Sequence, residues 1–185
     1  SKNTRNNNKI IFVKDVLICL QELAKFHRKK IKTKIIALTG SNGKTTTKEL
    51  INLVLKQNFK TIATKGNLNN HIGVPLTILN ISKETEIGIV EMGANHKGEI
   101  KNLCEIAMPN IGYITNFGKA HLEGFKNLKG VIEGKSELYN YLIEKNGEIW
   151  INLNDKTQIS QTSKYKKKKT FGNSKISDFV FKFIS

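Results

Sequence analysis

The sequence predicts an α/β fold in which a mostly parallel sheet carries helices on both faces. Short apolar runs, such as residues 35–38 and 87–91, alternate with longer segments whose apolar residues recur at helical spacing. Strands that alternate with helices imply βαβ crossovers and therefore parallel pairing. The 185 residues suffice for one domain with a sizeable core.

The first expected element is a lead-in helix. Residues 1–9 are polar, and from Val13 apolar residues recur at helical spacing until a cationic turn at 27–30, which is typical of a helix C-terminus. One face of the second helix is expected to carry Leu50, Ile51, Val54 and Leu55. The lysine run 164–169 indicates a solvated turn, and the alternating residues 178–184 indicate a last strand. Strands are expected at 35–38, 61–63, 87–91, 111–115 and 149–153, and helices at 45–56, 74–79, 99–107 and 128–143.

The net charge raises the question of a nucleic-acid partner. Lys and Arg number 31 against 15 Asp and Glu, for a formal charge of +16. Only Arg5 and Arg28 are arginines, and the many lysines accompany many Asn and Ile, all with A/T-rich codons. A compositional bias therefore explains the charge better than a polyanion does, and we expect no nucleic-acid partner.

Cysteine usage and hydropathy bear on the location. Cys19 and Cys104 lack CxxC spacing, which suits a reducing compartment. No signal peptide is recognisable, and no apolar run approaches the roughly 18 residues of a membrane span. We expect a cytoplasmic protein that is a monomer.

The most informative stretch is residues 35–47, which read IIALTGSNGKTTT. A buried strand followed by a Gly-rich turn and a helix start aims backbone N–H groups at one point, and this geometry binds phosphate. The loop is G-x-x-G-K-T, because Leu38 stands where the first glycine of the longer P-loop pattern would be. Lys44 would reach the β- and γ-phosphates and Thr45 would ligate Mg²⁺; the alternative is an ordinary βα turn. The candidate ATP-binding residues are Gly40, Ser41, Asn42, Gly43, Lys44, Thr45 and Thr46.

Two further candidates follow strands, where ligands gather in open α/β sheets. Glu91 ends the apolar run 87–90 and could hold Mg²⁺, or it could be a solvent-exposed carboxylate. His121 follows the strand at 111–115 and could be a metal ligand, or a surface or capping residue.

Lys135 stands in the middle of the apolar stripe of helix 128–143. A lysine there must snorkel, pair or be chemically altered, because a bare buried ammonium is costly. The polar loop 66–75 is a weaker candidate, since its amides could bind a pyrophosphate or a carboxylate or could cap the next helix. Its candidate substrate-binding residues are Asn67, Asn69, Asn70 and His71.

Together these motifs resemble the Mur ligase family of ATP-dependent amide-forming enzymes. The resemblance covers about residues 13–155 and rests on LTGSNGKTT at 38–46, the loop 66–75, EMGANHKGEI at 91–100, and residues 116–125. The block at 91–100 points to the member that adds D-alanyl-D-alanine to a UDP-N-acetylmuramoyl-tripeptide in peptidoglycan precursor synthesis.

The resemblance implies a mechanism and a division of labour. ATP would phosphorylate the tripeptide carboxylate, and the amine of D-alanyl-D-alanine would attack the acyl phosphate. Lys44 and Lys135 are the implied catalytic residues; Thr45 and Glu91 match one Mg²⁺ site, and His121 a second. Lys135 matches a lysine that relatives carbamylate with CO₂.

The resemblance also implies that the chain is one part of a larger enzyme. Residues 1–30 would be a tail and lead-in helix from a missing UDP-sugar-binding domain, and 31–185 a central ATP-binding domain truncated at its C-terminal end. Such a fragment is expected to be inactive alone. The alternatives are another Mur or folylpolyglutamate-type ligase, a nucleic-acid-binding P-loop ATPase, and a nucleotide-binding remnant.

Overall fold

The structure is a computed structural model that describes residues 10–118 and 122–181. Its centre is a seven-stranded parallel sheet with the strand order β2-β3-β1-β4-β5-β6-β7. The strands are β1 (Lys34–Thr39), β2 (Thr61–Ala63), β3 (Ile87–Glu91), β4 (Ile111–Ile114), β5 (Glu148–Asn152), β6 (Lys168–Gly172) and β7 (Phe179–Val180). The helices are α1 (Val16–Lys30), α2 (Lys44–Leu55), α3 (Gly73–Leu79), α4 (Glu99–Ala107), α5 (Leu122–Phe125), α6 (Leu128–Glu144) and α7 (Lys156–Gln161).

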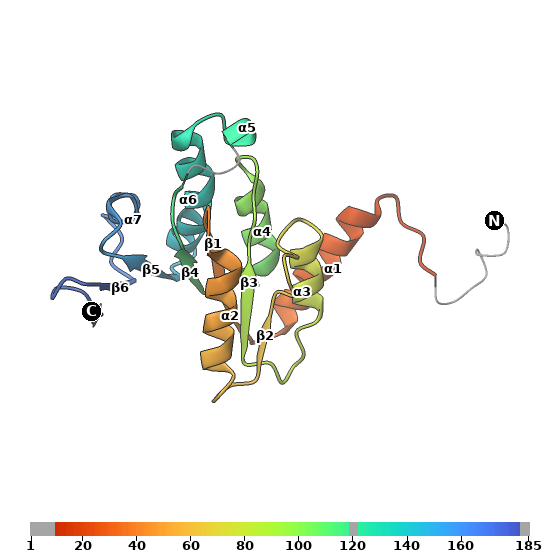
Figure 1. The fold of residues 1–185 in the computed structure, drawn as a ribbon. Helices are drawn as coiled ribbons and strands as arrows, with labels where there is room; N and C mark the ends of the chain where they lie inside the picture. Colours follow the sequence, from red (N-terminus) through yellow and green to blue (C-terminus); the bar gives the residue numbers. More distant parts are fainter. Residues whose placement is uncertain (1–9, 119–121, 182–185) are drawn as a thin grey trace.

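The helices lie on both faces of the sheet, as predicted. On one face α1, α3, α4 and α6 pack against one another, and Figure 1 shows α1 and α3 side by side next to α4. Gly112 lets α6 approach β4 closely, because a Cβ there would lie 2.4 Å from Leu142 Cδ1. The opposite face carries α2, which packs on β1, β2 and β3.

Arg28 ties α1 to the rest of the fold. Its side chain is 7% exposed and donates hydrogen bonds to the carbonyls of Ala107 (2.7 Å) and Met108 (3.1 Å), where α4 ends. It also donates to Asn110 Oδ1 (3.3 Å), an atom that accepts the backbone N–H of Ile35 in β1 (2.8 Å). The buried guanidinium thus supplies the donors that the last carbonyls of a helix lack.

Most expected elements are confirmed, and several have the predicted bounds within a residue. Three differences concern the second half of the chain. The short helices α5 and α7 were not predicted, and the last strand is confined to Phe179–Val180 within the described residues. The third difference is β6, where a solvated turn was expected.

The prediction of a turn at 164–169 is wrong for Lys168 and Lys169, which belong to β6. This strand pairs in parallel with β5, and Lys168 is level with Ile149. Lys168 Nζ donates to the carbonyl of Thr162 (2.9 Å), while Phe171 packs edge-on against Tyr113 with ring centroids 5.5 Å apart. Tertiary pairing therefore outweighs the low strand propensity of lysine.

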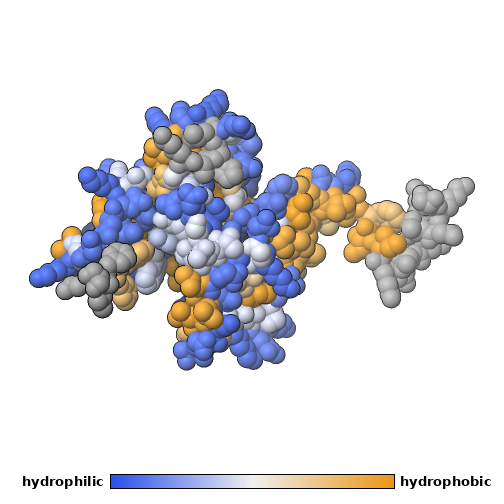
Figure 2. All heavy atoms as spheres, in the orientation of Figure 1, coloured by the Kyte–Doolittle hydropathy of each residue, from blue (hydrophilic) through white to orange (hydrophobic). Residues whose placement is uncertain are grey.

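The helix α2 is confirmed, but its apolar face is largely exposed. Leu50 and Val54 are 57% and 68% exposed, and the side chain that α2 buries completely is Lys48. Figure 2 shows exposed apolar side chains over α1 and over the end of α2. In the part of the chain that the structure describes, no helix is long and apolar enough to cross a membrane.

Candidate nucleotide and metal site

The phosphate-loop candidate is a tight turn between β1 and α2. Gly40 has φ +145°, and a Cβ there would lie 1.9 Å from Thr115 Oγ1. Gly43, at φ +76°, caps α2 without a side-chain hydrogen bond. These two positions require glycine, one for space and the other for its left-handed backbone. The predicted strand, turn and helix start are therefore confirmed.

The loop is fastened to the segment that follows β4. Ser41 donates its backbone N–H to the carbonyl of Asn116 (3.1 Å) and its hydroxyl to the carbonyl of Gly118 (2.8 Å). Thr115 Oγ1 donates to the carbonyl of Asn42 (2.6 Å), which also accepts from Asn116 Nδ2 (3.1 Å). The turn is thus held in shape from outside.

Lys44 lies at the first position of α2 and is half-buried. Its ammonium donates to the carbonyl of Gly40 (2.9 Å), within its own loop. Burial lowers the pKa of Lys44, and the negative charge of Glu91 opposes that shift. Lys44 is therefore a cation held at the mouth of the loop, where a phosphate chain would lie.

Glu91 is buried at the end of β3 and is not the solvent-exposed carboxylate of the alternative interpretation. It is 1% exposed, and its Oε1 accepts from Asn69 Nδ2 (2.8 Å) and Thr45 Oγ1 (3.3 Å). Its backbone N–H donates to Thr64 Oγ1 (3.0 Å). Its other oxygen, Oε2, has no hydrogen-bond partner among the described residues, and the nearest cation is Lys48 Nζ at 3.8 Å.

This arrangement fits Mg²⁺. A buried carboxylate oxygen without a hydrogen-bond partner lies beside the Thr45 hydroxyl, at the start of the phosphate-loop helix. Mg²⁺ is usually held by one or two protein oxygens together with waters and substrate phosphates. No group of three His, Cys, Asp or Glu residues suited to a metal occurs in residues 10–118 and 122–181.

Lys135 is buried, as its position in the stripe predicts. It is 1% exposed, and its ammonium lies 5.6 Å from the centroid of the Phe125 ring. Burial, followed by the positive charge of Lys44, lowers the pKa of Lys135 from 10.5 to about 8. The side chain does not snorkel to solvent, and no ion pair of it occurs among the described residues.

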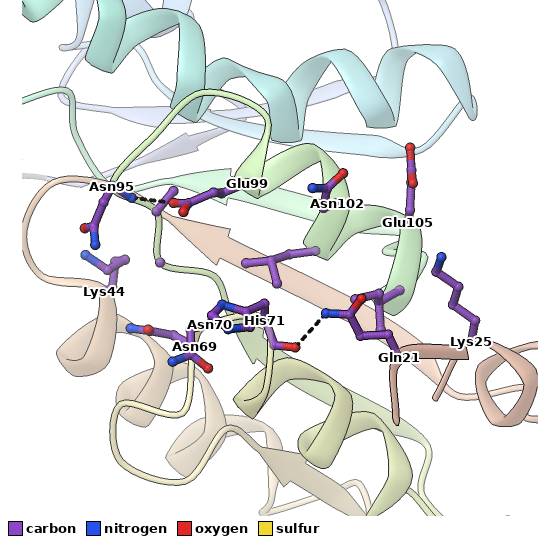
Figure 3. A pocket seen from close by; sticks show the side chains of 14 residues that line it. Gln21, Lys25, Lys44, Asn69, Asn70, His71, Asn95, Glu99, Asn102 and Glu105 are labelled. Carbon is purple, nitrogen blue, oxygen red and sulfur yellow. Dashed lines mark hydrogen bonds between the residues drawn. The ribbon is translucent and has the colours of Figure 1, made fainter. Parts of the chain in front are cut away.

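A cavity of about 580 Å³ extends from Lys44 between α1, α4 and the loop 66–72. Figure 3 shows Lys44 and Asn95 at one end and Lys25 and Glu105 at the other. Three of the four predicted substrate residues, Asn69, Asn70 and His71, line this cavity, and Asn67 does not. Asn70 Oδ1 also accepts from the backbone N–H of Gly73 (2.9 Å) at the start of α3, so the loop both lines the cavity and caps the helix.

Lys48 is a site residue that the sequence analysis missed. It is 0% exposed and donates to the carbonyls of Thr64 (2.7 Å) and Gly66 (2.8 Å). The sequence does contain the signal that could have revealed Lys48. As with Lys135, it is a lysine at an apolar position of a helix, because it lies on the same side of α2 as Ile51 and Leu55.

His121, the predicted second metal ligand, lies outside the described residues.

The sequence and the fold both match known proteins. Residues 38–184 match the Mur ligase middle domain. The chain is 39% identical over 183 residues to the UDP-N-acetylmuramoyl-tripeptide--D-alanyl-D-alanine ligase of Bacillus subtilis, covering 99% of this chain and 39% of that protein. The MurF ligase of Thermotoga maritima, solved in complex with ADP, superposes with a TM-score of 0.82 and 33% identity, over 92% of this chain and 40% of that one.

A more distant structure shares the fold of this chain but has little sequence identity with it. The L. casei FPGS structure has a TM-score of 0.55 and 10% identity, over 88% of this chain and 51% of that one, so the likeness concerns the fold alone. The first-named relative is longer, and this chain spans about two fifths of its length. The phosphate loop, the buried Glu91 and a domain match over 147 of the 185 residues agree, and the chain belongs to the Mur ligase family.

Proposed function

We propose that this chain is the ATP-binding part of an enzyme that joins D-alanyl-D-alanine to UDP-N-acetylmuramoyl-tripeptide in the cytoplasm, during peptidoglycan precursor synthesis. The observation that carries the proposal is the 39% identity to the Bacillus subtilis ligase along 99% of the chain. The site geometry supports it, because Lys44 of the phosphate loop lines one end of a cavity of about 580 Å³, and Asn69, which also lines that cavity, is hydrogen-bonded to Glu91.

The reaction has two steps. A carboxylate oxygen of the tripeptide attacks the γ-phosphorus of ATP, the bond to the β,γ-bridging oxygen breaks, and ADP leaves. The amine of D-alanyl-D-alanine then attacks the acyl carbon, inorganic phosphate leaves, and the nitrogen releases a proton. Negative charge gathers on the phosphoryl oxygens first and on the acyl oxygen second, so preorganised positive groups stabilise both transition states.

The described residues have distinct roles in this scheme. The N-terminus of α2 would bind the phosphates through the backbone N–H groups of its first turn, residues 44–46, while the N–H groups of Ser41 and Asn42 are donated to Asn116 and hold the turn in shape. Lys44 exchanges its bond to the Gly40 carbonyl for one to the β- and γ-phosphates. Thr45 and Glu91 would hold Mg²⁺, which neutralises phosphate charge when it is bound.

Lys135 would act as a carbamate together with His121 at a second Mg²⁺. Its neutral amine attacks the carbon of CO₂, an N–C bond forms, and the nitrogen loses a proton to solvent, which leaves an anionic carbamate. The support is a fully buried lysine that lies near Lys44 and has an aromatic face as its partner among the described residues. The anionic carbamate could pair with a metal cation, and this pairing would offset the cost of a buried charge, which the unmodified ammonium meets with an aromatic face.

A chimeric enzyme tests the proposal. Residues 1–185 replace the matching segment of the Bacillus subtilis ligase, and ADP release is measured with both substrates, with each alone, and with other amines in place of D-alanyl-D-alanine. Release that requires both substrates is expected, and release with glutamate instead would favour the folylpolyglutamate type. Release that needs DNA or RNA would favour the nucleic-acid-binding ATPase. The 185 residues alone are expected to bind ATP with Mg²⁺ but to form no amide, because domain closure completes such sites.

Two variants of the chimera test the metal ligands. Thr45→Val and Glu91→Gln are each expected to lower kcat by a hundredfold or more and to raise the Mg²⁺ concentration needed for half-maximal rate. Lys56→Met, an exposed change just after the end of α2, is the control and should leave both quantities unchanged. A Glu91→Gln variant with the Mg²⁺ requirement of the parent would contradict the assignment.

A further inference from the structure

Lys48 is a fully buried lysine whose ammonium contacts two separate parts of the chain. It is 0% exposed, and its ammonium lies between two separate parts of the chain. On one side it donates to the carbonyls of Thr64 (2.7 Å) and Gly66 (2.8 Å), where the chain leaves β2. On the other side lies Glu91 Oε2 at 3.8 Å, the oxygen that has no hydrogen bond among the described residues.

The two carbonyls belong to the start of the loop that lines the cavity. From Gly66 the chain continues to Asn69, whose amide donates to Glu91 Oε1 (2.8 Å) and whose carbonyl accepts from the N–H of Gly93 (2.8 Å). A Cβ on Gly93 would lie 2.6 Å from Asn69 Oδ1, so the loop sits tightly against the segment after β3. Lys48 and Asn69 therefore hold the same loop and the same carboxylate from two sides.

Packing alone does not account for a lysine at this position. A buried ammonium is costly unless it is paired and hydrogen-bonded, and an apolar side chain of similar length would fill the space on α2 without that cost. Glu49, the other carboxylate near the ammonium (3.0 Å), is 59% exposed. Inside the protein the ammonium makes hydrogen bonds to the two loop carbonyls and an ion pair with Glu91 at 3.8 Å, and only the ion pair requires a charge.

We propose that Lys48 is a positioning residue that couples the nucleotide site to the loop 64–70. This inference rests on the proposed function. Lys48 sits one helical turn after Lys44, so it is rigidly connected to the phosphate loop. Through Glu91 it sets the orientation of the proposed Mg²⁺ ligand, and through the Thr64 and Gly66 carbonyls it sets the wall of the cavity where the tripeptide would lie.

The first test uses the 185-residue chain and needs no catalysis. ADP binding is measured by calorimetry with Mg²⁺ and, in EDTA, without it, for the parent, for Lys48→Met and for the control Lys56→Met. Without metal, we expect Lys48→Met to bind ADP with an affinity within twofold of that of the parent. The factor by which Mg²⁺ raises the affinity for ADP should be at least tenfold smaller in Lys48→Met than in the parent. Amide hydrogen exchange in residues 65–71 should accelerate at least tenfold, with exchange in β4 unchanged. Loss of affinity in both conditions, or none in either, would overturn the proposal.

The second test measures kinetics in the chimeric ligase. Lys48→Met should raise KM for the UDP-linked tripeptide at least tenfold and lower kcat, while KM for D-alanyl-D-alanine stays within twofold. A merely structural defect would lower the amount of active enzyme and leave all KM values unchanged, and that outcome would also overturn the proposal. If the parent chimera forms no amide, the proposed function is wrong. The calorimetry would still show whether Lys48 affects the Mg²⁺-dependent binding of ADP.

A second substitution guards against a variant that does not fold. Lys48→Gln keeps an amide donor for the loop carbonyls but has no charge, and it enters the same calorimetry if Lys48→Met shows no native circular dichroism. Asn69→Ala removes the other hydrogen bond to Glu91 and should show the same selective loss of the Mg²⁺-dependent affinity. Equal affinities for the parent and Lys48→Gln with Mg²⁺ would contradict a role for the charge.

Discussion

Replacing Lys135 with methionine should stabilise the fold while it abolishes ligation. The side chain is 1% exposed and its ammonium has the Phe125 ring as its partner. Burial and Lys44 lower the pKa of Lys135 from 10.5 to about 8. At about 1.36 kcal/mol per tenfold change, keeping this ammonium in the folded state at pH 7 costs roughly 3 kcal/mol. Methionine has a similar length and carries no charge.

The expected gain is smaller than that cost, because methionine loses the cation–π contact, worth about 1 kcal/mol. Lys135→Met should therefore raise the free energy of unfolding by about 2 kcal/mol at pH 7. Between pH 8 and pH 10.5 the unfolded parent binds more protons at this residue than the folded parent, so the stability of the parent rises with pH there. The advantage of the variant should shrink by about 2 kcal/mol between pH 7 and pH 9.5.

Urea unfolding of the 185-residue chain measures both quantities. The buffers contain EDTA and are free of CO₂, so that the lysine stays unmodified, and Lys129→Met, an exposed change on α6, is the control. The control should differ from the parent by less than about 0.5 kcal/mol at either pH. A Lys135→Met variant that is less stable than the parent at pH 7, or whose advantage does not change with pH, would refute the reasoning.

Three further substitutions address stability and the phosphate loop. Arg28→Met leaves the carbonyls after α4 without their donors and should lower the free energy of unfolding by about 3 kcal/mol in urea, against less than about 0.5 for Lys29→Met. Gly134→Ala would place a Cβ 2.4 Å from Phe125 Cε1 and should cost about 1–3 kcal/mol; an unchanged midpoint would show that α5 moves aside freely. Gly40→Ala should weaken ADP binding at least tenfold in calorimetry, because its Cβ would collide with the segment after β4, and parent-like affinity would contradict that geometry.

The central part of the fold could be predicted because local signals and tertiary structure agree there. Strands β2 and β3 have the predicted bounds. For β3 the reason is that a buried parallel strand is an apolar run that ends at a turn, whereas β2 is a partly buried strand at the edge of the sheet. The neighbourhood of Thr45 and Glu91 could be predicted as well. The parallel register pairs Leu38 with Glu91, so the carboxylate is level with the start of the phosphate loop.

The burial of individual side chains of α2 and the presence of β6 could not be predicted, because the periodicity of apolar residues does not determine how an element is oriented or paired in the fold. The rotation of α2 about its axis is set by the loop at its start, which turns Lys48 toward the sheet and leaves Leu50 and Val54 outside. The same apolar pattern would have suited an orientation with the leucine inward. In β6 the parallel pairing with β5 decides the structure against the propensity of Lys168 and Lys169.

The lysine excess has a chemical meaning at a few positions only. Lys48 and Lys135 are buried and Lys44 is half-buried, whereas Glu91 is the buried acid among the described residues. This end of the sheet therefore carries surplus positive charge in a place of low solvent access, and such charge favours a compact polyanion over a surface-bound duplex. Tripolyphosphate at about 100 times its Kd should stabilise the 185-residue chain by about 2.7 kcal/mol, a rise of roughly 5–10 °C in Tm. Double-stranded DNA at the same phosphate concentration should raise Tm by less than a third of that, because the duplex cannot enter the turn between β1 and α2. An equal rise with DNA would instead place the binding on the exposed lysines.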